Sequence, residues 1–542
     1  MYTGVAPDIK PEVLDNAYAH AGYRRRRARY VALGTRTMNN QAQLIAYVDR
    51  LPGGSFADLR ALLDGPLAGA FGGVHVLPFY YPIDGADAGF DPIDHTQVDA
   101  RLGTWDDVAA LAAHTEVMAD VIVNHISRRS PQFEDFDSRG SDSPYAGLFL
   151  TAARVFPHGA TVADLLALEG PRPTLPFTKH RNAHGAPLLL WTTFTSEQID
   201  IDVTHPEGRR YLTGILDRLQ SAGVRAIRLD AVGYAIKKAG TSCFMIPETQ
   251  AFIADITAQA RARGMEVLVE VHGHYRTQLA VAGQVDWVYD FALPPLVLHL
   301  LYAGDVTPLR RWLALRPNNA VTVLDTHDGI GVADAAGDTA AGDAALGDTD
   351  AGDAGLLPPA AITSLIETIH ERSRGESRLA SGDAARNVDA HQINCTFYDA
   401  LGRRDDEYLV ARAIQCFVPG IPQIYYVGLL AGTNDMERLR RTGEGRDVNR
   451  HSYSAAELHH ALRSPVVTTL LALLRLRNAH PAFQGQFTVE APSAHALALR
   501  WDAGEHVARF ELDLAPLRAV VTCSAHGAHP GARVLHLAGG RS

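Results

Sequence analysis

Short apolar runs alternate with amphipathic stretches through most of the chain. Eight runs predict β-strands: 43–48, 73–78, 117–124, 224–230, 267–271, 287–291, 320–325 and 423–427. Helical patterns of about a dozen residues, with apolar positions on one face, separate most of them. Because strands and helices alternate eight times, the pattern predicts an α/β fold of the (β/α)8 TIM-barrel type rather than an open sheet.

Three stretches exceed what a minimal barrel needs. One follows the third strand, one follows the seventh and contains an Ala-Gly-Asp tract at 333–355, and the last alternates apolar and polar residues from Phe487 to His536. Such a tract buries too little apolar surface to form a core, so we expect a disordered or loosely packed loop there. Its Gly-Asp repeats resemble calcium-binding repeats only weakly, and a solvated linker is the preferred interpretation.

The expected domain organisation follows from these interruptions. It comprises an N-terminal extension (1–38), a barrel in three parts (39–123, 205–330 and 402–483), an inserted subdomain (124–204), an inserted loop region (331–401) and a C-terminal antiparallel β domain (484–542).

Composition excludes several classes of protein. The 542 residues carry a formal net charge of −11, with 46% hydrophobic and 20% charged residues, which argues against nucleic acid or an anionic membrane as partner. Four cysteines without a CxxC motif indicate reduced thiols and a cytoplasmic enzyme. We recognise no signal peptide, membrane-spanning pattern or metal-ligand spacing, so no metal is expected.

Acidic residues stand where several predicted strands end. The clearest example is Asp230, which follows Arg228 by two residues. Side chains alternate along a strand, so these two point the same way, and the guanidinium would keep the carboxylate ionised, as a nucleophile requires. A structural ion pair explains this stretch equally well by itself. Glu270 and Asp328 also stand at strand ends, and His125 follows another.

These strand-end segments resemble the conserved regions of one enzyme family. The matching segments are 120–125, 227–234, 266–272 and 324–329, with 85–95, 316–320 and 445–451 in support. They are similar to the sucrose phosphorylase group of the α-amylase family (glycoside hydrolase family 13). The resemblance extends from about Asn40 to about Phe487.

The resemblance implies a role for each matching residue. Asp230 would be the nucleophile, Glu270 the general acid/base, and Asp328 the stabiliser of the transition state. The chemistry agrees, since retention needs two carboxyls about 5 Å apart, one ionised and one protonated, and apolar neighbours would raise the pKa of Glu270. The remaining substrate-binding residues implied are Asp87, Phe90, His125, Arg228, Tyr234, His327, Arg446 and Gln392.

The acceptor side separates the alternatives within the group. The resemblance implies inorganic phosphate as co-substrate, no cofactor, and Arg172, Asp389 and His391 as acceptor- or phosphate-binding residues. Enzymes acting on free sucrose typically carry Asp-Leu-Tyr-Gln where this chain has Asp389-Ala390-His391-Gln392, which favours sucrose 6'-phosphate. Free sucrose, glucosylglycerol-type acceptors, hydrolysis and a non-catalytic binding barrel are the alternatives. The partners expected are small molecules, and a homodimer is one option for the assembly.

Overall fold

The structure is a computed structural model that describes residues 38–85, 87–171, 174–336, 355–382, 392–525 and 533–539. Most of the expected N-terminal extension, most of the Ala-Gly-Asp tract, and the acceptor residues Arg172, Asp389 and His391 lie outside the described residues.

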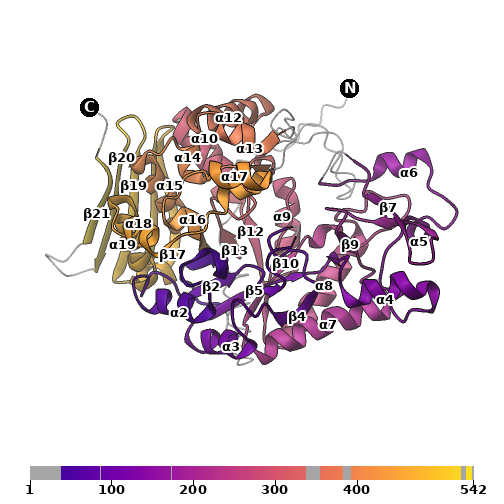
Figure 1. The fold of residues 1–542 in the computed structure, drawn as a ribbon. Helices are drawn as coiled ribbons and strands as arrows, with labels where there is room; N and C mark the ends of the chain where they lie inside the picture. Colours follow the sequence, from indigo (N-terminus) through magenta and orange to yellow (C-terminus); the bar gives the residue numbers. More distant parts are fainter. Residues whose placement is uncertain are drawn as a thin grey trace, which may run out of the picture.

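Eight parallel strands close into a barrel at the centre of the molecule (Figure 1), in the order β1-β16-β13-β12-β11-β10-β5-β2. The predicted TIM barrel is therefore confirmed. All four residues of β11 are buried, because one face lines the barrel and the other meets the helices. The strands are β1 (Gln43–Ala46), β2 (Gly73–Val76), β5 (Glu116–Ile122), β10 (Ala226–Asp230), β11 (Glu266–Val269), β12 (Trp287–Asp290), β13 (Ala320–Thr322) and β16 (Ile421–Tyr425).

Some strand boundaries differ from the prediction. The last strand, expected at 423–427, spans Ile421–Tyr425, because the chain turns into the short helix α16 (Tyr426–Leu429) directly afterwards. The strand expected at 320–325 ends at Thr322, so Asp325 to Asp328 form a loop above the barrel. Because β13 ends at Thr322, the Asp328 carboxylate lies beyond the end of the strand.

Helices surround the barrel, and local sequence signals mark their ends. In α7, which leads into β10, Pro206 occupies the first turn and the His205 side chain caps it by accepting from the Glu207 N–H. The barrel helices are α2 (Phe56–Asp64), α3 (Trp105–His114), α7 (Pro206–Ser221), α8 (Pro247–Ala262), α9 (Tyr275–Ala282), α10 (Leu293–Ala303), α11 (Thr307–Leu315), α15 (Asp405–Phe417) and α19 (Pro465–Ala479).

A mixed group of short elements stands between β5 and β10, at one side of the barrel in Figure 1. Its pair β6–β9 is antiparallel and sets His125 opposite Asp200, next to the end of β5. The elements are β6 (His125–Ser127), α4 (Pro131–Arg139), α5 (Ala152–Val155), α6 (Val162–Ala167), β7 (Phe177–Arg181), β8 (Pro187–Trp191) and β9 (Gln198–Asp200).

The second insertion begins and ends at one short antiparallel pair, β14 (Ile330–Gly331) with β15 (Gln392–Ile393). The described start of the Ala-Gly-Asp tract is not loosely packed as expected. Its residues form the 3-10 helix η4 (Ala333–Ala335), and Asp334 is fully buried, because its carboxylate is hydrogen-bonded inside the protein. The insertion also carries α12 (Pro359–Arg372) and α13 (Glu376–Ser381), and α14 (Phe397–Ala400) follows β15. Three further elements, α17 (Met436–Thr442), η7 (Gly445–Asn449) and α18 (Ala455–Ala461), follow β16.

The chain ends in a five-stranded antiparallel sheet at the other side of the barrel (Figure 1), as the alternating pattern predicted. Its strands are β17 (Gln486–Ser493), β18 (Ala496–Ala503), β19 (His506–Asp513), β20 (Arg518–Ala525) and β21 (Arg533–Gly539). The Trp501 indole donates to the Phe417 carbonyl at the end of α15 (2.6 Å), which joins sheet and barrel. Across the described ranges, no helix is both long and apolar enough to cross a membrane.

Candidate active site

Three carboxylates meet at the C-terminal end of the barrel, the end where TIM-barrel enzymes carry their chemistry. Asp230 is the last residue of β10, Glu270 follows β11 directly, and Asp328 lies in the turn after β13. All three belong to the residues proposed from the sequence, and the barrel brings them together from segments that together span about 100 residues of the chain.

One buried guanidinium connects two of these carboxylates. The Arg228 side chain is 2% exposed; its Nη1 lies 3.0 Å from Asp230 Oδ1 and its Nη2 lies 2.6 Å from Glu270 Oε1. Nη1 also contacts Asp120, whose other oxygen lies 3.0 Å from His75 Nε2. Adjacent strands therefore place the two central carboxyls on neighbouring nitrogens of a single cation.

Asp230 and Glu270 influence each other's ionisation. The resulting shifts in their pKa values are opposite to those expected. Burial and the Glu270 charge raise the pKa of Asp230 well above its usual value, although Arg228 opposes this. Burial also favours the neutral form of Glu270, but Arg228 and His272 outweigh it and lower the pKa of Glu270 to about 2. The prediction that apolar neighbours raise the pKa of Glu270 is wrong, because Glu270 lies beside two cationic groups.

Two arginines and two aspartates form a second group of charges. Arg446 Nη1 lies 3.0 Å from Asp328 Oδ1 and 3.6 Å from Asp87 Oδ2. Arg450 lies 3.6 Å from Asp87 and 3.7 Å from Asp328, and its Nε donates to the His327 carbonyl (3.0 Å). Burial acts against ionisation of Asp328, but Arg446, His327 and Arg450 lower its pKa well below its usual value. Asp328 is therefore an ionised carboxylate.

Aromatic rings and histidines line the space beside these charges. Phe90 is stacked on His327 with ring centroids 4.7 Å apart and planes inclined by 6°. His125 Nε2 lies 2.9 Å from the Phe90 carbonyl, so this nitrogen already has a partner within the protein. Tyr234 contacts Phe194 and Phe244. Apolar faces and fixed polar atoms in this combination suit a sugar ring.

Of the segment proposed to bind the acceptor, the described part begins with Gln392. Its side-chain Nε2 lies 2.9 Å from His272 Nε2, and that histidine nitrogen lies 3.7 Å from Glu270 Oε1. Burial would lower the pKa of His272, but Asp334 and Glu270 raise it to about 10. The structure therefore places the His272 ring between Glu270 and Gln392.

The sequence reasoning missed several residues of this site. Arg450 lies in the quoted segment 445–451, four residues after Arg446, and was not singled out. His272 follows Glu270 by two residues, so strand alternation would have placed both on one face. Asp120 precedes Ile122, the last residue of β5, by two positions, so the same alternation would have placed both side chains on one face of that strand. Nothing local in the sequence pointed to Asp334, which lies in a tract of low complexity.

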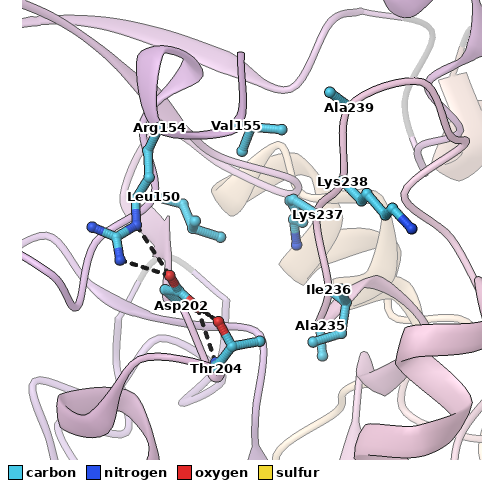
Figure 2. Close-up of a pocket in the computed structure, with 10 residues that line it drawn as sticks. All are labelled: Leu150, Arg154, Val155, Asp202, Thr204, Ala235, Ile236, Lys237, Lys238 and Ala239. Carbon is cyan, nitrogen blue, oxygen red and sulfur yellow. Dashed lines mark hydrogen bonds and ion pairs between the residues drawn. The ribbon is translucent and has the colours of Figure 1, made fainter. Parts of the chain in front are cut away.

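A separate cavity of about 450 Å³ lies between the segment after β10 and the inserted elements (Figure 2). Arg154 and Asp202 form one wall and are bonded to each other (2.9 Å), while 235–239 form the opposite wall. Lys237 turns its ammonium group to Asp200 (2.7 Å) and Asn124 (2.6 Å). The strand-end carboxylates do not line this cavity, so it is distinct from the candidate active site.

Within the described residues, no group of three or more His, Cys, Asp or Glu side chains has the arrangement of a metal site.

The comparisons with known proteins agree on one family. Residues 70–282 match the catalytic domain of α-amylase. Sucrose phosphorylase of Agrobacterium vitis is 58% identical over 90% of this chain and 98% of its own length. Sucrose phosphorylase of Bifidobacterium adolescentis is 50% identical over 86% of this chain and 90% of its own. The crystal structure of sucrose 6F-phosphate phosphorylase from Thermoanaerobacter thermosaccharolyticum superposes with a TM-score of 0.83 at 36% identity, covering 92% of this chain and 99% of that one.

Proposed function

The chain belongs to the sucrose phosphorylase family of glycoside phosphorylases, and on that premise we propose that it transfers a glucosyl unit from a sucrose-type α-glucoside to inorganic phosphate. The products are α-glucose 1-phosphate and a ketose. The observation that carries the proposal is the single guanidinium of Arg228 that contacts both Asp230 and Glu270. Two carboxyls joined in this way favour the short separation of retaining enzymes, about 5–5.5 Å, over the longer one of inverting enzymes.

In the first displacement, an Asp230 oxygen attacks the anomeric carbon and the bond to the ketose oxygen breaks. Glu270 gives its proton to that oxygen. In the second, a phosphate oxygen attacks the same carbon, the ester to Asp230 breaks, and Glu270 takes the phosphate proton. Asp328 and Asp87, ion-paired with Arg446 and Arg450, bind hydroxyls of the glucosyl ring. Two inversions restore the α configuration.

The first displacement needs the proton on Glu270 and the charge on Asp230. Arg228 and His272 are the groups that lower the pKa of Glu270. We propose that the leaving oxygen of the donor takes the place of Arg228 at Glu270 Oε1, which lets Glu270 hold the proton while Arg228 stays beside Asp230. The apparent pKa values of the reaction then belong to the coupled pair rather than to either residue.

We propose free sucrose as the donor, because the sucrose phosphorylases of Agrobacterium vitis and Bifidobacterium adolescentis share more of their residues with this chain than the sucrose 6F-phosphate enzyme does. Sucrose 6'-phosphate is the second candidate, since His391 stands where the sucrose enzymes typically carry tyrosine and, like Arg172, can bind phosphate. A charge-assisted hydrogen bond of about 1.5–3 kcal/mol corresponds to a tenfold or larger preference.

Product analysis tests both the proposed type of reaction and the proposed donor. Purified protein is incubated with sucrose or sucrose 6'-phosphate, with and without phosphate, and the products are followed by NMR. We expect α-glucose 1-phosphate to dominate when phosphate is present. A β product, or glucose formation that ignores phosphate, would rule out retaining phosphorolysis. The ratio of kcat/KM for the two donors identifies the substrate.

A further inference from the structure

Both nitrogens of His272 are in contact with the second insertion. Nδ1 lies 3.5 Å from Asp334 Oδ2 and Nε2 lies 2.9 Å from the Gln392 amide. Asp334 follows β14 and Gln392 begins β15, and these strands pair with Gly331 opposite Gln392. The start and the end of one insertion therefore meet at a single imidazole, which is itself 3.7 Å from Glu270.

Packing and hydrogen bonding leave the His272 ring little freedom to rotate. His272 is stacked on Phe291, with centroids 3.9 Å apart and planes inclined by 21°. Asp334 is fully buried and its second oxygen accepts from the Gly273 N–H and the Gln278 amide, each at 3.1 Å. Three donors thus converge on the Asp334 carboxylate. The carboxylate defines which ring nitrogen faces Glu270, since Nδ1 is held on the opposite side.

The charges around His272 favour a cationic ring. Glu270 faces it from its own segment and Asp334 from η4, whereas Phe291 after β12 and Gln392 in β15 bring no charge. Arg228 is one contact further away, on Glu270. Two carboxylates thus contact one imidazole, and its pKa is raised to about 10 despite burial. In the structure the Gln392 amide presents its Nε2 to His272 Nε2, so a ring protonated on both nitrogens requires the amide to turn over and present its oxygen.

We propose that Asp334 is a positioning residue that fixes His272 with Nε2 toward Glu270 and keeps the ring cationic where the phosphate acceptor enters. The inference rests on the proposed phosphorolysis. Phosphate is an anion and must approach a site that already holds Asp230, Glu270 and Asp328. An oriented imidazolium lowers the cost of this approach, whereas water as acceptor gains nothing from it.

The variant Asp334→Asn tests this role, because it removes the charge and keeps the size of the side chain. At pH 7.5 we expect the KM for phosphate to rise about tenfold. The rate of glucosyl transfer to water, measured as glucose without phosphate, should change less than twofold. An equal loss of both reactions would show a merely structural role and would overturn the proposal.

The pH dependence gives a second readout. In the variant, His272 should lose its proton nearer to the ordinary value of about 6.5, whereas in the wild type it keeps it to a higher pH. The phosphate kcat/KM of the variant, divided by that of the wild type at the same pH, should therefore fall as the pH rises above about 6.5. The division cancels the titration of phosphate itself. A ratio that stays flat from pH 5.5 to 8.5 contradicts the proposal.

A double-mutant cycle separates action through His272 from a direct effect. Asp334→Asn should not raise the phosphate KM further in a His272→Gln background, and additive effects would contradict the mechanism. The control is Asp137→Asn, which makes the same change in the Asp137–His180 contact of the inserted subdomain and should leave the phosphate KM unchanged.

A measurement on the wild type keeps the inference falsifiable if Asp334→Asn fails to fold. Ring nitrogen NMR of labelled histidine, assigned by the signal lost in His272→Gln, should show both nitrogens protonated at pH 7.5. A neutral ring at that pH overturns the inference. This NMR measurement does not depend on whether the protein catalyses phosphorolysis. Failure of the proposed function, seen as no phosphate-dependent glucose 1-phosphate from the wild type, is therefore distinguishable from failure of the inference.

Discussion

The donor side and the acceptor side of the proposed site are built from different parts of the molecule. On the donor side, Asp230 ends β10, Glu270 directly follows the neighbouring strand β11, and both contact one buried arginine. On the acceptor side, Asp334 and Gln392 come from the two ends of an insertion and meet at His272. The strands hold the first group by a closed ladder of hydrogen bonds, whereas the second depends on connecting segments.

This difference assigns different tasks to the two sides. A site held by barrel strands keeps its geometry for every substrate that shares the glucosyl unit, so it determines the reaction. Segments between elements change more easily without affecting the core, so we expect them to determine the acceptor. Changes on the donor side should therefore affect all substrates alike, and changes on the acceptor side should affect the choice among them.

The largest effect is expected from Asp230→Asn. The amide cannot form the glycosyl ester, so turnover should fall on the order of 10⁴-fold or more with every donor and acceptor. Glucose 1-phosphate release measures this, and an unchanged melting temperature shows that the variant is folded. Asp217→Asn on the exposed part of α7 is the control. Turnover within tenfold of the wild type would remove Asp230 from the mechanism.

Glu270→Gln should slow the reaction with sucrose by about 10²–10⁴-fold, because the leaving ketose oxygen no longer receives a proton. Donors whose leaving group needs no proton, such as α-glucosyl fluoride, should recover most of the first step. The comparison of burst-phase rates for both donors measures the recovery. Equal losses for the two donors would show that Glu270 is not the acid.

An intermediate effect is expected from Arg450→Met, which leaves Asp87 and Asp328 with fewer cationic partners. The loss of one charged contact of about 1.5–3 kcal/mol should raise the donor KM by about ten- to a hundredfold. Sucrose and sucrose 6'-phosphate should be affected equally, since they share the glucosyl unit. Arg60→Met on α2 serves as the surface control. A selective effect on one donor would contradict the separation of the two sides.

The smallest effect is expected on the acceptor side, from His391→Tyr. The change should shift the ratio of kcat/KM for sucrose 6'-phosphate and sucrose by about tenfold toward sucrose, because the group proposed to bind phosphate is lost. The KM for α-glucosyl fluoride should stay the same. If the ratio does not move, His391 has no part in acceptor selection, and phosphate recognition must come from elsewhere.

The sequence alone predicted the barrel, since hydrophobic periodicity depends on neighbours close in the chain. It also pointed to Asp230, Glu270 and Asp328, because each follows a recognisable strand and matches a family segment. The C-terminal sheet was readable from alternation in the same way. These features depend on local pattern, so they needed no knowledge of contacts between distant segments. The strand at 421–425 was misplaced by two residues because α16 begins with equally apolar residues.

Only the tertiary structure showed which charged groups surround each residue of the site. Arg228 was expected to keep Asp230 ionised, yet its second nitrogen contacts Glu270. This contact arises because β10 and β11 lie side by side, with Arg228 opposite Leu268. Asp334, in a tract that looks unstructured by composition, is buried against His272. A pKa depends on every charge within a few ångströms, and in a barrel those charges come from strands and insertions far apart in sequence. No local pattern contains that information.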